Sequence, residues 1–209
     1  MTIQQMHDRV DQWLDTVHTA RFPVDQKDRA LNTAISQVVN DRYYPLNPKD
    51  RENAFESNQR IRDELYPLIV NAPAISANTD FISISTLTNY RFLLSLNVII
   101  DGKTYSSIPS DYNEWTFALS KDPYAAPRIE EPYNVYHLEE ATGLRVKWGS
   151  VGILQWGMIS YLRNPIVVSL TGGINCDLPI NLHEEICQIA GQILKSQVQN
   201  LKRQGGEDS

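Results

Sequence analysis

The spacing of apolar residues changes twice along this chain, and that change limits what it can fold into. Up to about residue 70, apolar side chains recur three and four positions apart, as on one face of a helix. After the stretch NAPAISANTD, β-branched and aromatic residues take over with a period of two, which is typical of half-buried strands. The helical spacing returns near residue 180. The sequence therefore predicts helices at both ends and a β-rich middle.

Three helices are expected within residues 1–70. The first carries an apolar face from Ile3 to Val17, and the second runs through DQKDRALNTAISQVVNDRYY with a stripe from Ala30 to Val39. Asn47 followed by Pro48 is typical of a helix start and predicts a third, more polar helix. A last helix is expected over residues 179–203, where Asn181 and Glu184 have capping-box spacing ahead of an apolar stripe.

The β-rich middle is expected over residues 80–170. In RFLLSLNVII every second residue from Phe92 to Ile100 is apolar, and Asp101-Gly102 predicts a two-residue hairpin turn into KTYSSI. NVYHLEE and LRVKWG predict a second hairpin, and ILQWGMISYLR and IVVSL predict two more strands separated by Asn164-Pro165. Residues 121–133 are proline-rich and are expected to form a connecting arm.

These elements predict an α+β subunit spanning residues 1–209. The N-terminal helices and the C-terminal helix are expected to pack together as one layer, because neither amphipathic face can remain in water. The middle would then be an inserted set of antiparallel β-hairpins forming a sheet. At 209 residues the chain can bury a core of ordinary size.

Composition narrows the classes of partner. The formal net charge of −6 disfavours a broad phosphate-binding surface, because Lys and Arg supply most of the affinity for nucleic acid. No stretch approaches the roughly 20 apolar residues that a membrane span needs, and MTIQQMHDRV has no apolar signal core, so a soluble protein made in the cytosol is expected. Two cysteines are too few for a disulfide framework, which favours free thiols.

One weak metal-site hypothesis arises from Cys176, His183 and Cys187. His183 and Cys187 lie four residues apart and would share a helical face, as zinc ligands on helices do. A fourth ligand is missing from the pattern. The alternative is that Cys187 is a small core residue and His183 caps the helix or faces solvent. This alternative is favoured, so no metal and no other cofactor are expected.

Motifs for catalysis are also absent from the sequence. Gly172-Gly173 lacks the Lys-Ser/Thr of a phosphate loop and is better explained as a turn after a strand, and no Gly-x-Ser-x-Gly elbow occurs. A non-enzymatic protein is therefore expected. Aromatic and proline residues concentrate in the middle region, which favours a subunit interface, although ordinary packing or a glycan-binding or hydrolase groove would also use them. The interface candidates are Tyr112, Trp115, Tyr124, Pro127, Arg128 and Tyr133.

Four local patterns, in this order, resemble a known family. They are KDRALNTAISQVVNDRYY; FESNQRIRDELYPLIV; SSIPSDYNEW with KDPYAAPR; and ISYLRNPIVVSL leading into DLPINLHEEICQIAGQIL. Together they span nearly the whole chain, and their specificity rests on order and spacing. The chain resembles virion proteins of tailed bacteriophages, particularly the neck or ring (head-to-tail connector) proteins of crAss-like and related Bacteroidetes phages.

The resemblance implies a virion location and a structural role. It implies a homo-oligomeric ring, commonly twelvefold, that contacts the portal and a neighbouring ring or tail protein. DNA would pass through the lumen without sequence-specific binding, and no membrane would be involved. Another phage structural role, such as a tail-completion or portal-associated protein, is the alternative that this resemblance leaves open.

Overall fold

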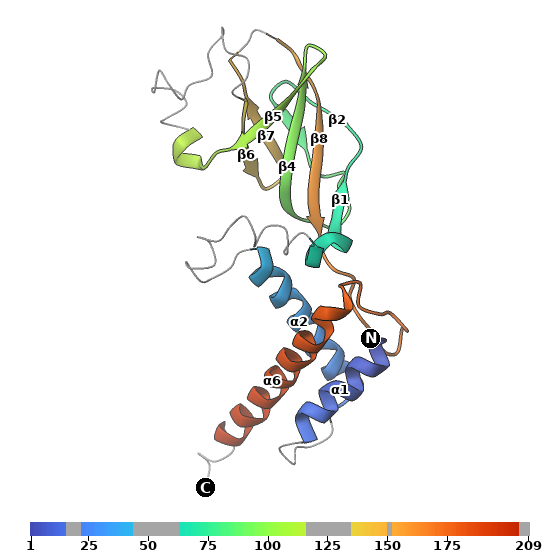
Figure 1. Ribbon diagram of the computed structural model, residues 1–209. Helices are drawn as coiled ribbons and strands as arrows, with labels where there is room; N and C mark the ends of the chain where they lie inside the picture. The colour runs from blue at the N-terminus through green and yellow to red at the C-terminus, as the bar shows by residue number, and fades with distance from the viewer. Residues whose placement is uncertain (16–21, 44–62, 116–134, 150–151, 205–209) are drawn as a thin grey trace. The chain divides into compact units, whose positions relative to one another are not determined.

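The computed structural model of the protein describes residues 1–15, 22–43, 63–115, 135–149 and 152–204 (Figure 1). The chain divides into two compact units. The helical unit combines Met1–Leu68 with Pro165–Ser209, and the sheet unit is Ile69–Asn164. The sheet is thus an insertion between two parts of a helical unit, and the predicted α+β class is confirmed.

Within the residues that the structure describes, the helical unit is built around three helices. They are α1 (Ile3–Asp15), α2 (Val24–Tyr43) and α6 (Ile180–Gln204), and α6 packs against both of the others (Figure 1). Their apolar faces meet in a core that includes Met6, Leu31, Ile35 and Ile186, each fully buried. The expectation that the terminal helices pack together is therefore confirmed, because burying these faces removes their apolar surface from water.

The contact between α1 and α6 is close. A Cβ atom added to Gly191 would lie 3.2 Å from the Cβ of Trp13, so glycine permits this approach. Near the start of α6, Glu184 accepts two hydrogen bonds from the Nε of Arg9, at 2.8 and 2.9 Å. The helix begins at Ile180, before Asn181, and the predicted capping box between Asn181 and Glu184 is therefore wrong.

The predicted third helix falls mostly outside the described residues. The part that is described contains one helical turn at residues 63–65 and a 3-10 helix, η1 (Tyr66–Leu68). Leu65 and Leu68 are buried there. Arg42, at the end of α2, is held between the carboxylates of Glu64 and Glu185, with N···O distances of 2.5 and 2.6 Å. These ion pairs join the turn, α2 and α6.

The sheet unit has eight strands within the described residues. Their order is β1-β8-β4-β5-β6-β7-β3, and β2 pairs with β8 beside β1. The strands are β1 (Ile69–Asn71), β2 (Ile75–Ser76), β3 (Phe81–Ser83), β4 (Tyr90–Ile100), β5 (Lys103–Pro109), β6 (Val135–Glu140), β7 (Gly143–Lys147) and β8 (Leu154–Arg163). β-Structure therefore starts at Ile69, ahead of the predicted boundary at residue 80.

Both predicted hairpins are present. Asp101 and Gly102 have φ angles of +49° and +76°, as a two-residue turn of this kind requires, and they join β4 to β5. β6 and β7 form the second hairpin. However, β5 and β6 run parallel over Ser107–Pro109 and Val135–His137, so the sheet is mixed and the expectation of a purely antiparallel sheet is wrong. The long connection between the two hairpins allows this parallel pairing, which a tight turn could not produce.

Strand β4 contains an irregularity that changes which side chains are buried. Its register against β8 shifts between Leu93 and Ser95, which leaves Leu94 opposite no partner and exposed. Leu96, Val98 and Ile100 are buried as the alternation predicts, but Leu93 and not Leu94 packs against the core. A bulge inserts one residue and thereby reverses the alternation on one side of it.

The sheet curls into a half-barrel around its own core. The segment between β2 and β3 forms hydrogen bonds to two different strands. Ala77 N donates to Gln155 O of β8, and Asp80 O accepts from Val146 N of β7. Inside, Gly157 of β8 faces Ile82 of β3 so closely that a Cβ atom at Gly157 would lie 2.5 Å from Ile82 Cδ1. The core includes Ile82, Leu96, Val98, Ile100, Val135, Leu144, Val146, Leu154, Ile159 and Tyr161.

The predicted strand IVVSL is absent. Residues 165–168 have no regular structure, and Ser169 forms an isolated bridge with Ile174 across a turn in which Gly173 has φ of +65°. The interpretation of Gly172-Gly173 as a turn is confirmed. Side chains of α2 bind the backbone of this segment at Val168 and Leu170.

Candidate interaction surfaces

The outer face of the sheet carries no charged side chain over three cross-strand rows. One row pairs Ser106 with Asn97 and Asn97 with Met158; the next runs Thr104, Ile99, Trp156, Ser76; the third runs Ser95, Ser160, Asn71. We call these ten residues the sheet face: Asn71, Ser76, Ser95, Asn97, Ile99, Thr104, Ser106, Trp156, Met158 and Ser160.

The centre of the sheet face is apolar and partly open to solvent. Trp156 is 43% exposed, and its neighbours Ile99 and Met158 are half-buried. Small hydroxyl and amide side chains surround them. When one face of a sheet is in water, charged or polar residues on that face alternate along each strand with buried apolar residues on the other. Interface centres instead contain few charged residues and are enriched in Trp and Met. The sheet face shares with interface centres its lack of charge and its Trp and Met residues, whereas its four serines are typical of ordinary surface.

The helical unit presents a second apolar surface on the segment that precedes α6. We call residues 165–180 the aliphatic loop; its last residue, Ile180, is the first residue of α6. Val167 is 68% exposed and Ile180 is 71% exposed, and Ile166 and Ile174 are exposed as well. Four aliphatic side chains open to solvent within one short segment are unusual, because each would gain free energy by leaving water.

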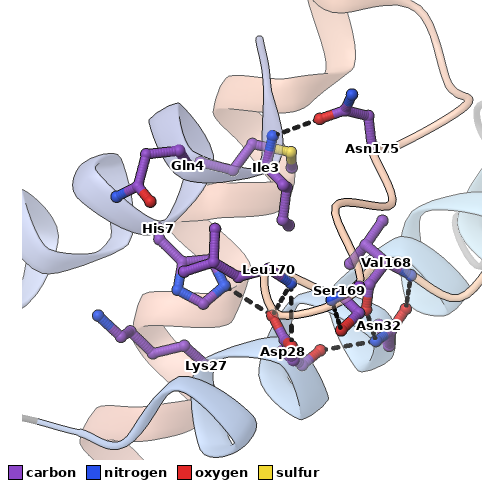
Figure 2. Close-up of polar contacts among 12 residues, drawn as sticks. Ile3, Gln4, His7, Lys27, Asp28, Asn32, Val168, Ser169, Leu170 and Asn175 are labelled. Carbon is purple, nitrogen blue, oxygen red and sulfur yellow. Dashed lines mark hydrogen bonds and ion pairs between the residues drawn. The ribbon is translucent and has the colours of Figure 1, made fainter.

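The side chain of Asn32 holds the aliphatic loop to α2. Its amide Nδ2 donates to the carbonyl oxygen of Val168 at 3.0 Å, and its Oδ1 accepts from the Val168 backbone N–H at 2.8 Å (Figure 2). Nδ2 also donates to Asp28 O at 2.8 Å. Asn32 thus satisfies both backbone groups of Val168, as a neighbouring strand would do.

Asp28, one helical turn earlier, forms a second attachment. Its two carboxylate oxygens each accept from the Leu170 backbone N–H at 3.2 Å, and its Oδ1 lies 2.7 Å from Nε2 of the buried His7 on α1 (Figure 2). Because a carboxylate only accepts, His7 must carry a hydrogen on Nε2. The Asp28 carboxylate therefore ties α1, α2 and the aliphatic loop together.

Three further contacts fix the remainder of the loop. Asn175 Oδ1 accepts from the backbone N–H of Ile3 at 2.7 Å, at the start of α1 (Figure 2). Asp177 Oδ2 accepts from the Ile166 N–H at 3.2 Å, and Gly173 N donates to Leu170 O at 3.1 Å. The aliphatic side chains are consequently displayed on a backbone that is held at several points.

The structure does not support the metal-site hypothesis. Among the described residues, no group of three or more His, Cys, Asp and Glu side chains is placed to hold a metal ion. Nε2 of His183 donates to Leu178 O at 2.9 Å, which leaves Nδ1 to accept from the Met1 amino group at 3.0 Å. Burial raises the pKa of the Cys187 thiol to about 12, and Sγ points at Met6 O. A protonated thiol is a poor ligand.

A serine and histidine meet in the sheet unit, but with the wrong hydrogen-bond direction for nucleophilic catalysis. Ser107 Oγ donates to Leu96 O at 2.7 Å, so the contact of 2.8 Å with Nδ1 of His137 must be a donation from histidine to serine. A catalytic base instead accepts from the hydroxyl. Burial lowers the pKa of His137 to about 4, which keeps the ring neutral. The pair joins β4, β5 and β6 where the sheet changes from antiparallel to parallel.

A pocket of about 310 Å³ lies beside β1 in the sheet unit. Its lining combines apolar side chains with polar ones: Val70, Ala72, Pro73, Leu87 and Tyr161 with Asn71, Thr86, Thr88, Asn89 and Arg163. The hydroxyl of Tyr161 donates a hydrogen bond to Thr88 O at 3.1 Å, and both residues line the pocket.

Two of the six predicted interface residues can be located. Tyr112 is 74% exposed, and Trp115 is half-buried with the Nζ of Lys147 5.7 Å from its ring centroid. Asp111 caps their short helical turn by accepting from Glu114 N at 2.7 Å. Tyr124, Pro127, Arg128 and Tyr133 lie outside the described residues, as does the predicted arm 121–133.

Sequence reasoning missed both surfaces described above. The signal for the sheet face was present, because residues 94–100 and 153–162 contain no charged residue at all. In the aliphatic loop, the apolar residues of IVVSL predict a strand and not an exposed loop. The attachment of the loop by Asn32 had no local signal, since the two partners are 136 positions apart.

Comparison with protein-family models finds no match to this sequence, and a search of curated proteins finds no relative. In the part of the chain that the structure describes, no helix combines the length and the apolar character needed to cross a membrane.

Proposed function

We propose that the protein is a structural component of a tailed-bacteriophage particle. In this role it is a subunit of an oligomeric ring in the head-to-tail connector, or neck, which joins the portal to the tail and surrounds the DNA passage. The ordered motifs described above suggest the family, and the uncharged sheet face is the structural observation that carries the proposal. A scaffold role of this kind requires interfaces and no catalytic centre or cofactor.

The requirement for two surfaces supports a ring in particular. Ring contacts are heterologous, so every subunit must present two different complementary surfaces to its two neighbours. In this proposal the sheet face and the aliphatic loop, which lie on different units of the chain, serve as the two surfaces. Contacts with the portal and with a neighbouring ring or tail protein would use other parts of the subunit.

Net charge supports a passage through which DNA moves freely. The chain carries 25 acidic and 19 basic residues. A surface rich in Lys and Arg would bind the phosphate backbone and retard the DNA, whereas an acidic lining would not. We therefore expect no sequence-specific DNA binding, and we place the protein in the virion after synthesis in the cytoplasm of the bacterial host.

Mass spectrometry of purified phage particles tests this proposal directly. The protein should be present in intact particles at a fixed copy number per portal, and electron microscopy should place it as a closed ring at the neck. Detection only in infected-cell lysate, and never in purified particles, would overturn the proposal. A position elsewhere in the tail would instead identify the alternative role of a tail-completion protein.

A further inference from the structure

The pocket beside β1 lies at the end of the sheet where β4 begins and β8 ends, and it continues into the core of the sheet unit. Val70 on β1 pairs with Tyr161 on β8, and both residues line the pocket. Tyr161 is buried and belongs to the core, and Val70, Ala72 and Leu87 pack against that core. The floor of the pocket is therefore apolar, and its lining residues all belong to the sheet unit.

The rim of the pocket is polar and includes one cation. Thr86, Thr88 and Asn89 come from the segment between β3 and β4, and Arg163 is the last residue of β8. Successive side chains of a strand point to opposite faces, so Arg163 lies on the same face of β8 as Tyr161. Among the ten described residues that line the pocket, Arg163 is the only charged one. An anion bound among these residues would meet a guanidinium and no carboxylate.

Hydrogen bonds hold the rim in place. The hydroxyl of Tyr161 donates to Thr88 O at 3.1 Å, and the backbone N–H of Asn164 donates to Asn89 O at 2.7 Å. Asn89 has a φ angle of +55°, a conformation that asparagine tolerates better than most residues. The pocket is thus formed before any ligand arrives. Filling such a site costs less free energy than filling one whose walls must first be ordered.

The volume of the pocket limits what it can hold. At about 310 Å³ it is near the lower end of the range of small-molecule sites, which is roughly 300–1,000 Å³. A closed apolar cavity of roughly 150 Å³ already holds a benzene ring. The pocket therefore has room for an aromatic ring or a branched aliphatic group together with a short polar extension.

We propose that this pocket binds a small carboxylate with an apolar body. The apolar body lies on Val70, Leu87 and Tyr161, and the carboxylate accepts hydrogen bonds from the guanidinium of Arg163. A guanidinium has five N–H donors; Nη1 of Arg163 donates to Asn164 O at 3.2 Å, and bidentate binding of a carboxylate uses two donors. The same chemistry occurs in a free small acid and in the last residue of a protein chain. This inference goes beyond the proposed function and does not depend on it.

Titration of the full chain with 3-phenylpropionate tests the proposal, and 3-phenylpropanol is the uncharged probe with the same apolar body. Calorimetry and saturation-transfer NMR should detect binding of the acid. The alcohol should bind at least tenfold more weakly, because it cannot form a charge-assisted pair with the guanidinium. Absence of binding at about 10 mM acid, or equal affinity for the two probes, would overturn the proposal. This comparison uses the wild type alone, so it does not depend on the folding of any variant.

Two variants separate the cation from the apolar floor. Arg163→Gln should weaken binding of the acid at least tenfold and leave the affinity for the alcohol unchanged. Ala72→Leu places a larger side chain in the pocket and should weaken binding of both probes. Lys103→Gln, which removes an exposed cation outside the pocket, should bind both probes as the wild type does. Circular dichroism verifies that each variant folds. A folded Arg163→Gln or Ala72→Leu variant with wild-type affinity for the acid would contradict the site.

A second pair of probes distinguishes a free acid from a chain end. N-acetylphenylalanine carries its carboxylate beside a peptide group, as the last residue of a protein does, and its amide lacks the carboxylate. If the pocket takes a chain end, N-acetylphenylalanine should bind at least as tightly as 3-phenylpropionate. Binding of 3-phenylpropionate with rejection of N-acetylphenylalanine would identify a free acid. An amide that binds as tightly as its acid would overturn the role of the carboxylate.

Discussion

The side-chain amide of Asn32 bonds both backbone polar groups of Val168, at 2.8 and 3.0 Å, across 136 positions of sequence. One side chain on α2 thereby does for the aliphatic loop what a paired strand does within a sheet. Because the loop has no strand partner of its own at Val168, its order depends on side chains of the helical unit.

Replacing Asn32 with alanine should therefore destabilise the loop and the helical unit. The change leaves the N–H and the carbonyl of Val168 without these partners, which costs about 1–3 kcal/mol. Chemical denaturation should show the loss, and hydrogen exchange at the Val168 amide should accelerate. Thr33→Ala, at the next and exposed position of α2, should change stability by less than about 0.5 kcal/mol. Equal effects of the two changes would argue against the role assigned to Asn32.

Ile35→Asp tests the core of the helical unit. Ile35 is fully buried on α2, and a carboxylate there would have neither water nor a partner, so we expect a loss of more than about 3 kcal/mol or failure to fold. Ile35→Val should cost only about 0.5–1.5 kcal/mol. Gln37→Asp, which is exposed on the same helix, provides the matched control. Thermal unfolding measures all three, and a stable Ile35→Asp variant would contradict the packing described here.

The parts of the fold that sequence could predict are those with local signals. The stripe from Ala30 to Val39 predicts α2, and Asp101-Gly102 predicts its hairpin, because each depends on neighbours along the chain. The parallel pairing of β5 and β6 depends on a distant return of the chain and has no such signal. The bulge at Leu94 is hidden for the same reason, since an alternating pattern does not show where one extra residue is inserted.

The sequence alone does not single out the residues of the two candidate surfaces, for two reasons. Tyr112 and Trp115 were chosen because they are aromatic, yet Trp156, which the structure places at the centre of an uncharged face, is aromatic too. Choosing between them needs the cross-strand register, which brings Ile99 and Trp156 together. Ile166, Val167 and Val168 are β-branched, so this stretch predicts a strand. The backbone N–H groups of Val168 and Leu170 instead donate to the side chains of Asn32 and Asp28.

Acid should destabilise the sheet unit through His137. The pKa of this buried ring is lowered from 6.5 to about 4 by burial, so between these values the unfolded chain binds a proton that the folded chain does not. Stability should therefore be highest above pH 6.5, fall by roughly 3 kcal/mol as the pH drops to 4, and lose nothing further from this group below that. Burial also lowers the pKa of His183, which adds a loss of the same sign.

His137→Asn isolates the contribution of His137 from that of other groups. The asparagine amide can still donate to Ser107 from a position near that of Nδ1, but it does not titrate. Urea unfolding at pH 7 and at pH 5 should show a smaller difference in unfolding free energy for the variant than for the wild type. The same pH dependence in both proteins would show that His137 is not responsible for the acid sensitivity.

The contact between Gly157 and Ile82 gives a test of how closely the two sides of the curled sheet approach. A Cβ atom at Gly157 would lie 2.5 Å from Ile82 Cδ1, so Gly157→Ala forces the buried isoleucine to shift and should cost about 1–3 kcal/mol. Ile82→Val removes the Cδ1 atom and should alone cost about 0.5–1.5 kcal/mol. In the double variant the new methyl group occupies the space vacated by Cδ1, so the combined loss should be smaller than the sum by at least about 0.5 kcal/mol. Chemical denaturation of the four proteins measures this coupling, and strictly additive losses would mean that these two residues do not meet across the core.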